Sequence, residues 1–355
     1  MNSLVLPTFT YNPILSLRNI LESLDKIGKD NGGTRAFGRP GYQASVDYVL
    51  SYATGKFGDA MDTVVQPFNL TYAETRNLTV IGPDGKEVFA QPAQYGPATP
   101  LPGGITAPLV DTPVDDENGS GCSPEDWEGI DAEGKIALVK RGVCYFSQKL
   151  LNAKKAGAVG VLVYNYDPGE NYTAATLQPG NRTEVVPMAL IPLEVGLDWK
   201  DRLAKGEELV ATLIVDSLME DRVTWNVIAE TKEGDPDNVV MMGAHLDSVP
   251  EGPGINDDGS GTAALLEIMS SFQKYTGFKN KVRFGWWGAE EEGLVGSIFY
   301  TGHLTPEEAD KIRFYFNYDM IGSIEPAYIV YDGEPTGTNM LVDYLKEAGK
   351  PAEIR

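Results

Sequence analysis

The chain has 355 residues, of which 42% are apolar, and a formal net charge of −22. This length suffices for two domains of ordinary size. So acidic a protein is a poor partner for nucleic acid, because phosphate binding relies on basic surface. An acidic field favours cationic ligands such as a free α-amino group, although solubility in an acidic medium is the simpler explanation of the charge. No apolar run is long enough to span a bilayer, so we expect no membrane segment.

Glycosylation sequons indicate the cellular compartment. Residues 1–13 lack the basic region and the long apolar core of a signal peptide. Five Asn-X-Ser/Thr sequons nevertheless favour the secretory pathway, and they begin at Asn69, Asn77, Asn118, Asn171 and Asn181. We therefore expect a secreted, extracellular or vacuolar glycoprotein whose leader is absent from this sequence.

The two cysteines, Cys122 and Cys144, fit the same interpretation. In a secreted protein an even number of cysteines suggests a disulfide. The bridge would close a loop of about 22 residues and stabilise the fold by roughly 3 kcal/mol on the chain-entropy model. Two cysteines alone cannot form a structural zinc site, and a cysteine nucleophile would need a base, for which the chain offers only His245 and His303.

The first predicted elements are helices at 13–24 and 41–55 and a strand at 64–72. Glycine and proline then become frequent, and short apolar runs replace long helices. A strand at 135–142, a helix at 144–158 and a strand at 159–165 follow, with Gly157 suited to the end of that helix. This change of pattern predicts a separate domain over 77–216.

The polar residues that carry chemistry follow an apolar run at 239–242, which is short enough for a buried strand. His245 and Asp247 come where that strand should end, and residues two apart on a strand share a face. A Gly/Pro-rich loop then delivers Asn256, Asp257 and Asp258. Ser260 is expected to cap the helix predicted at 262–274.

Two further strands end in acidic residues. The strand at 281–287 is followed by Glu290, Glu291 and Glu292, and the strand at 313–318 is followed by Asp319. Strands that alternate with helices predict an α/β fold with a mixed, mostly parallel sheet covered by helices. The strand beginning at Trp225 is separated from the 239–242 strand by a short turn, so we expect these two to be antiparallel neighbours.

Imidazole and carboxylate side chains at neighbouring strand ends suit zinc. Two zinc ions about 3.5–4 Å apart need a carboxylate between them and can clamp one hydrolytic water. A single acid after a strand is ordinarily a solvated loop residue. Three strand ends in a row, together with one of only two histidines, favour a metal centre instead.

The motifs HLDS, GPGINDDGSG, WWGAEEEG and NYDMIGS, which cover residues 226–323, resemble those of the zinc aminopeptidases of the M28 family. The resemblance implies a zinc-peptidase (phosphorylase/hydrolase-like) fold over 1–76 and 217–355. Residues 77–216 resemble the smaller α+β protease-associated (PA) domain that many such enzymes carry, with an implied role in substrate access or partner binding. The roles implied residue by residue are His245 and Asp319 as ligands of one zinc, Asp257 as the bridging carboxylate, Glu291 as a ligand of the second zinc, Glu290 as general base, and Asp247 as the carboxylate that orients His245.

The function implied is a monomeric zinc aminopeptidase that releases apolar, leucine-like residues from peptides with a free N-terminus. A serine hydrolase is disfavoured, because Ser260 lacks the G-x-S-x-G context, and no HExxH or nucleotide-binding motif is present. Glutaminyl cyclases share the fold but normally lack a PA domain. A non-catalytic, receptor-like binding protein of the same family remains the alternative of a different class.

In the resembling family a last zinc-ligand histidine lies well downstream, whereas this sequence ends at Arg355. We therefore expect a truncated chain that binds one zinc tightly and a second weakly or not at all. Such a fragment should have little activity and should tend to aggregate. His303 lies in a loop just before a helix, and we expect a surface histidine there rather than a substitute ligand.

Overall fold

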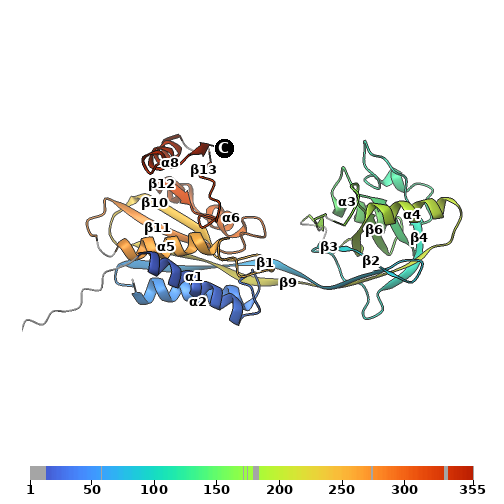
Figure 1. The fold of residues 1–355 in the computed structure, drawn as a ribbon, viewed down its shortest axis with the longest axis horizontal. Helices are drawn as coiled ribbons and strands as arrows, with labels where there is room; N and C mark the ends of the chain where they lie inside the picture. The colour runs from blue at the N-terminus through green and yellow to red at the C-terminus, as the bar shows by residue number, and fades with distance from the viewer. Residues whose placement is uncertain are drawn as a thin grey trace, which may run out of the picture. The chain divides into compact units, whose positions relative to one another are not determined.

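The computed structural model describes residues 13–56, 58–170, 172–173, 175–178, 184–272, 275–331 and 335–354. They form two compact units, one built from the chain up to Leu70 and from Arg222 onward, the other from Thr71 to Asp221. The chain passes between the units in two long strands, β1 (Met61–Ile81) and β9 (Val210–Thr231), which pair with each other (Figure 1). The expected boundaries, after residues 76 and 216, fall inside these two strands.

The sheet of the first unit has the strand order β12-β10-β11-β9. β10 (Asp235–His245) is parallel to both β11 (Asn280–Trp287) and β12 (Ile312–Asn317), whereas β9 is antiparallel to β11. The expectation that the Trp225 strand neighbours the 239–242 strand is therefore wrong, because β11 lies between them. A three-residue turn lets the chain reverse, but it does not decide which buried strand fills the adjacent place.

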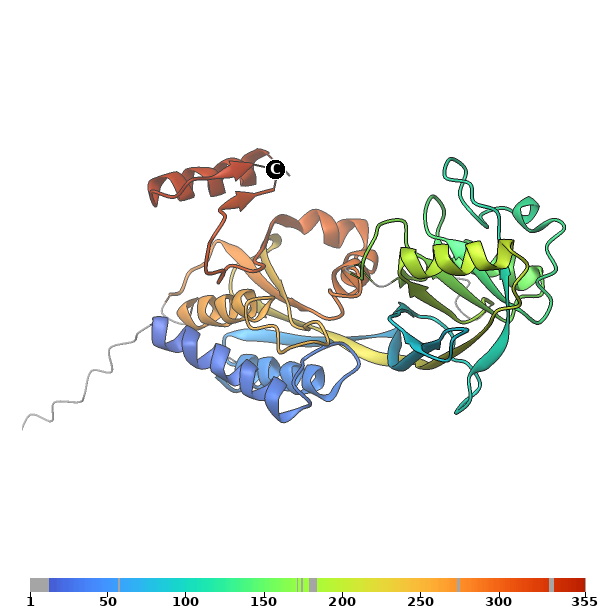
Figure 2. The same cartoon turned by 45° about the vertical axis from the view of Figure 1, so that its right-hand side comes forward.

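Helices cover both faces of this sheet. α1 (Pro13–Asp30), α2 (Pro40–Ser51) and α5 (Gly259–Phe272) lie together on one side (Figures 1 and 2). There Leu24, Leu265 and Phe284 are fully buried, and each such side chain stabilises the fold by about 1.5–3 kcal/mol. Since successive strand residues point to opposite faces, Trp287 instead packs with Tyr300 on the other side.

The remaining elements of the first unit are shorter. A π-helical turn (Tyr52–Lys56) extends α2. The opposite face and the end of the chain carry α6 (Val295–Gly302), α7 (Pro306–Lys311), β13 (Ile329–Val330), α8 (Pro335–Glu347) and β14 (Glu353–Ile354). No described helix is both long enough and apolar enough to cross a membrane.

The second unit is a separate α+β layer with the strand order β9-β4-β5-β6-β8-β3-β7. Its strands are β2 (Glu87–Val88), which pairs with β1, β3 (Gln91–Gln94), β4 (Ile105–Asp111), β5 (Ile136–Lys140), β6 (Gly160–Tyr164), β7 (Ala175–Thr176) and β8 (Met188–Ile191). Neighbours from β4 to β8 are parallel. A short 3-10 turn (Pro124–Trp127) and the helices α3 (Phe146–Lys155) and α4 (Leu193–Ala204) complete the unit.

The strand–helix–strand pattern predicted in this unit is confirmed as β5, α3 and β6. Val139 of β5, Leu150 of α3 and Val161 of β6 are all fully buried in one core. Gly157 ends the helical turn with φ +91°, and a Cβ at this position would lie 2.1 Å from a carboxylate oxygen of Glu133. Only glycine therefore fits the predicted C-terminus of the helix.

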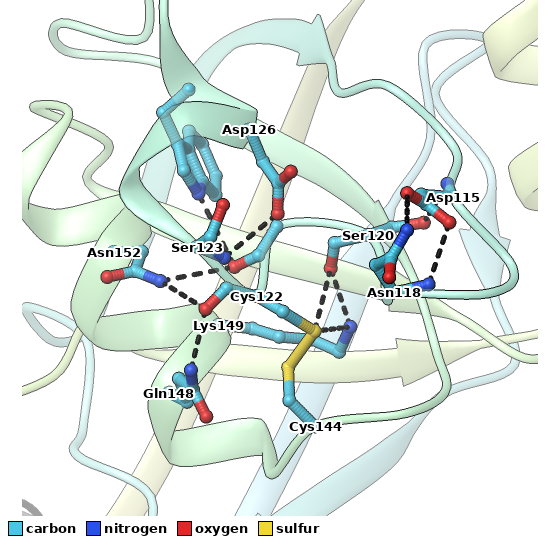
Figure 3. The surroundings of a disulfide bond; sticks show 12 residues. Asp115, Asn118, Ser120, Cys122, Ser123, Asp126, Cys144, Gln148, Lys149 and Asn152 are labelled. Carbon is cyan, nitrogen blue, oxygen red and sulfur yellow. Dashed lines mark hydrogen bonds between the residues drawn. A yellow bond between two sulfur atoms is a disulfide. The ribbon is translucent and has the colours of Figure 1, made fainter.

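The predicted disulfide between Cys122 and Cys144 is present (Figure 3). Beside it, Lys149 of α3 is fully buried. Its Nζ donates to the backbone oxygen of Ser120 at 2.6 Å and lies 3.4 Å from Cys122 Sγ. Burial lowers the pKa of Lys149 to about 8, against the opposing effect of the Asp126 charge. The bridge therefore sits next to a buried cation.

Three of the five sequon asparagines, Asn69, Asn77 and Asn118, are exposed in the structure. Asn171 and Asn181 lie outside the described residues. Asn118 also donates from its side chain to Asp115 at 3.0 Å. Exposure is what a glycan requires, and glycosylation stays a prediction at all five positions.

Candidate metal centre

The acidic strand ends meet at one edge of the sheet in the first unit. His245 is the last residue of β10, Glu290 follows the end of β11 by three residues, and Asp319 follows the end of β12 by two. Because β10 is parallel to both neighbours, all three ends point the same way. Open α/β sheets place their ligands at such an edge.

Carboxylates surround the imidazole of His245. Its Nε2 lies 2.9 Å from Asp257 Oδ1, 3.8 Å from Glu290 Oε2 and 4.0 Å from Asp319 Oδ1. His245, Glu290 and Glu291 each offer a ligand atom within 4.8 Å of the others. The structure thus brings together all the residues that the sequence nominated for the metal centre.

Asp247 is fully buried behind the imidazole. Its Oδ1 lies 3.7 Å from His245 Nδ1, and its backbone oxygen lies 3.2 Å from the same nitrogen. The carboxylate also accepts the backbone N–H groups of Glu290 at 3.0 Å and Glu291 at 3.3 Å. The backbone oxygen of Asp247 therefore orients the ring so that Nε2 faces the carboxylates, with the Asp247 carboxylate beside Nδ1. That carboxylate also ties the end of β10 to the end of β11.

Asp258 has a structural role that the sequence reading missed. It is fully buried, and its Oδ1 accepts the backbone N–H of Gly261 at 2.8 Å, which makes Asp258 the N-cap of α5. The expected cap, Ser260, is wrong, since its hydroxyl donates to Asn256 O at 2.7 Å from inside the helix. Aspartate is as good an N-cap as serine, so residue type alone does not favour Ser260 over Asp258.

The same carboxylate of Asp258 reaches two other strand ends. Oδ2 accepts the backbone N–H of His245 at 3.2 Å, and Oδ1 accepts that of Met320 at 3.3 Å. His245, Asp258 and Asp319 also form a group whose ligand atoms lie within 4.8 Å. The Asp257–Asp258 peptide bond is cis. Asp258 thus anchors the loop that presents Asp257.

Burial and mutual repulsion raise the pKa of four carboxylates of this centre. Burial raises the pKa of Asp258 to about 8, although the charge of His245 acts in the opposite direction. Burial, together with the charge of Asp257, raises the pKa of Glu291 to about 7. Burial also raises the pKa of Glu290 and of Asp319. Full ionisation of these carboxylates would therefore place more negative charge here than the surrounding protein stabilises.

His245 is affected in the opposite sense. Burial by itself lowers the pKa of its imidazole, but the hydrogen bond and the charge of Asp247, with further carboxylates behind it, raise the pKa to about 10. At neutral pH the ring is thus a cation among acids, in the place where a metal ion would otherwise sit.

The residues present fit zinc. Glu291 Oε1 is buried without a hydrogen-bond partner among the described residues, and a buried charged group without a partner is costly unless it coordinates a cation. One imidazole nitrogen and several carboxylate oxygens form a donor set that zinc accepts. The raised pKa values of the carboxylates indicate the same deficit of positive charge.

His303 lies apart from these groups. It follows the end of α6, where its Nδ1 contacts Phe299 O at 2.7 Å and its ring packs 4.0 Å from that of Phe299. It belongs to none of the candidate metal groups found among the described residues. His303 is exposed, which confirms its interpretation as a surface histidine.

Comparison with known proteins agrees with this geometry. The family model described as Peptidase family M28 matches residues 226–355, and the PA domain model matches residues 105–199. "Probable lipoprotein aminopeptidase LpqL" of Mycobacterium tuberculosis is 39% identical over 353 residues, covering 94% of this chain and 67% of the relative. An aminopeptidase of Pseudomonas aeruginosa is 42% identical, covering 88% and 59%. Leucine aminopeptidase 2 of Arthroderma otae is 41% identical, covering 86% and 58%.

Solved structures give the same result. The aminopeptidase from Aneurinibacillus sp. strain AM-1 superposes with a TM-score of 0.72 at 26% identity, covering 96% of this chain and 84% of that one. A zinc aminopeptidase from Bacillus subtilis has a TM-score of 0.68 at 27% identity, covering 95% and 79%. The chain spans 58–67% of the length of the curated relatives described above.

Proposed function

The chain belongs to peptidase family M28 and carries a PA domain, and from this membership we propose that it is a zinc-dependent aminopeptidase. The observation that carries the proposal is the convergence of His245, Asp257, Glu290 and Asp319 at the carboxyl edge of one sheet. A receptor-like relative would be free to lose the base or the ligands, and this chain retains them.

The metal-holding roles follow from the geometry around His245. His245 and Asp319 would hold one zinc, Glu291 a second, and Asp257 would bridge them. When bound, zinc supplies Lewis acidity toward a carbonyl oxygen and acidifies water. Among the described residues only the first ligand set includes an imidazole, so we expect this chain to hold one zinc more tightly than the other.

Glu290 acts as the general base. Its carboxylate lies 3.8 Å from His245 Nε2, at the rim of the metal-holding group. Burial raises the pKa of Glu290, which brings it closer to neutral pH and improves its ability both to take a proton from water and to return it to the leaving amine. The carboxylate of Asp247 accepts the backbone N–H of Glu290 and lies beside the Nδ1 of His245.

The substrates proposed are peptides with a free N-terminus, because an excess of carboxylates attracts an α-ammonium group. Preference for leucine-like residues is supported by relatives named leucine aminopeptidase 2. A secretory route is supported by the sequons and by the disulfide, a bond that persists in oxidising compartments.

The test uses the purified chain, stripped with a chelator and reloaded with zinc. Leucyl-anilide, aspartyl-anilide and N-acetyl-leucyl-anilide are compared while zinc per chain is measured. We expect zinc-dependent cleavage of leucyl-anilide at a low rate, as the sequence predicts for this chain, and none of the acetylated compound. Cleavage of the acetylated anilide would exclude an aminopeptidase, and zinc binding without any cleavage would support the non-catalytic alternative. Faster release of aspartate than of leucine would overturn the apolar preference.

A further inference from the structure

The loop between Asp247 and Asp257 is held by a segment from the start of the chain. This segment, residues 34–36, is named the strap below, and it joins α1 to α2. Its central residue, Arg35, has a fully buried side chain. None of the sequence motifs includes the strap.

The guanidinium of Arg35 binds both ends of that loop. Nη1 donates to the backbone oxygen of Leu246, directly before Asp247. Nε donates to the oxygen of Pro253 at 2.6 Å, and Nη2 donates to that of Gly254 at 2.9 Å. A planar fork of donors thus connects the chain entering the loop with the chain leaving it toward Asp257.

The backbone of the strap adds a second set of contacts. The N–H of Arg35 donates to Ser248 Oγ at 3.0 Å, and Thr34 Oγ1 donates to Val249 O at 2.9 Å. Ser248 Oγ in turn donates to Gly252 O at 2.8 Å. The loop is therefore bonded to the strap along its length and not only at its ends.

Close packing leaves the loop no room to shift. A Cβ at Gly28 of α1 would lie 2.6 Å from the Cβ of Pro253. Gly254 has φ +56°, and a Cβ there would lie 2.1 Å from the backbone oxygen of Asp257. Both glycines let the strap side and the metal side approach each other more closely than any other residue would allow.

The charge of Arg35 and its geometry act in different ways on a metal ion. Burial lowers the pKa of Arg35 to about 10 although Asp247 and Asp258 act to raise it, so the side chain is a cation at neutral pH. A cation near the centre opposes a bound divalent metal by Coulomb repulsion. Any favourable effect on metal binding must therefore come from the position that the fork gives to the loop.

We propose that Arg35 is a positioning residue of the metal centre, whose fork fixes the loop carrying Asp257 relative to Asp247 and so sets the zinc affinity. The proposal rests on the proposed function only in taking zinc as the metal. Arg35 touches no reacting atom and acts through three backbone oxygens.

The decisive variant is Arg35→Lys, which keeps the charge but offers one nitrogen where three separated donors are needed. We expect its zinc affinity, measured by competition with a chromogenic chelator, to fall by roughly 10- to 100-fold, as is usual when a residue supporting a metal ligand is changed. The zinc affinity of Arg35→Met should fall by a similar or a larger factor. Ser248→Ala removes the hydroxyl that accepts from the strap and donates to Gly252 O but leaves the Arg35 fork in place, and it should weaken zinc binding by a smaller factor.

Arg283→Lys is the matched control. Arg283 is a partly buried arginine of β11 that binds Glu230 at 2.7 Å and Tyr300 at 2.7 Å, away from the loop. The Arg283→Lys variant should have a lower thermal unfolding midpoint and an unchanged zinc affinity. Circular dichroism of the zinc-free proteins establishes that each variant is folded before affinities are compared.

Wild-type zinc affinity in folded Arg35→Lys would overturn the proposal, as would an equal loss in Arg283→Lys. If Arg35→Lys does not fold, Ser248→Ala decides the matter, and unchanged zinc affinity in that variant overturns the proposal as well. A wild-type chain that binds zinc but cleaves no aminoacyl-anilide contradicts the proposed function and leaves these affinity comparisons intact.

Discussion

The carboxylate of Asp247 accepts the backbone N–H of Glu290 at a distance of 3.0 Å. Asp247 follows β10 and Glu290 follows β11, so one buried side chain joins the ends of two adjacent strands. The same carboxylate lies 3.7 Å from the Nδ1 of His245. The proposed base and the proposed metal ligand thus share one support, and a change in it should disturb both.

Asp247→Asn should weaken zinc binding by roughly 10- to 100-fold. Asparagine offers one acceptor oxygen where the carboxylate offers two, so one of the two backbone N–H groups loses its partner, at a cost of about 1–3 kcal/mol in unfolding free energy. Chelator competition and urea unfolding measure the two effects. Asp237→Asn, at the exposed start of β10 where the carboxylate pairs with the exposed Lys311, is the control and should change stability by less than about 1 kcal/mol. Equal behaviour of the two variants would contradict the role of Asp247.

Glu290→Gln should retain zinc and lower kcat by roughly 100- to 10,000-fold, because glutamine cannot accept the proton of the attacking water. Zinc per chain and anilide hydrolysis are measured on the same preparation. The adjacent Glu292→Gln is the control and should keep most of the turnover. Near wild-type turnover in Glu290→Gln would show that another group is the base.

Zinc binding at pH 7 should release protons. The pKa of His245, about 10, and that of Glu291, about 7, mean that without zinc the ring holds one proton and the Glu291 carboxylate a fraction of one. Asp258, with a pKa of about 8, also holds a proton, but it is not a proposed ligand. Ligands must be deprotonated, so zinc affinity should rise with pH from 6 to 8. Calorimetry in two buffers of different ionisation enthalpy counts the protons. Zinc binding to the wild-type chain with no proton release would contradict the ligand role of His245.

Lys149 should make the stability of the second unit depend on pH. Its pKa is about 8 in the folded chain, against 10.5 for an exposed lysine. Between these values the unfolded chain binds more protons, so the contribution of this group to the unfolding free energy rises with pH, by about 3 kcal/mol in total.

The measurement for Lys149 is the difference in unfolding free energy between wild type and Lys149→Met at pH 7.5 and at pH 10.5. Other alkaline titrations cancel in that difference. The exposed lysine at the end of the same helix gives the control variant, Lys154→Met, which removes an amine of the same kind from the surface. A pH-independent difference for Lys149→Met would show that burial does not lower the pKa of this amine.

The sequence located the metal centre because its residues follow strand ends, and parallel strands bring successive ends to one edge. His245, Asp257, Glu290 and Asp319 are found together for this reason. The order of the strands was harder to predict, and the expectation that β9 lies beside β10 was wrong. A short turn shows that the chain reverses direction, but it does not determine which strand becomes the neighbour.

Two side chains close to the centre were missed for different physical reasons. Asp258 was not predicted to be the N-cap, because serine and aspartate are equally favourable N-caps and Ser260 was expected to take this role. Arg35 could not be found at all, because its three partners are backbone oxygens more than 200 residues further along the chain. Every residue has a backbone oxygen, so the sequence does not indicate which of them will accept a hydrogen bond.

The strap also constrains the order in which the protein can fold. Its arginine contacts carbonyls 211, 218 and 219 residues further along the chain. Contacts of such high sequence separation form late, since closing the intervening loop is entropically unfavourable. At synthesis rates of about 5–20 residues per second, the strap leaves the ribosome about 10–40 s before its partners. The second unit, whose residues 71–221 all emerge in that interval, can therefore be complete while α1 and α2 still await the sheet that covers them.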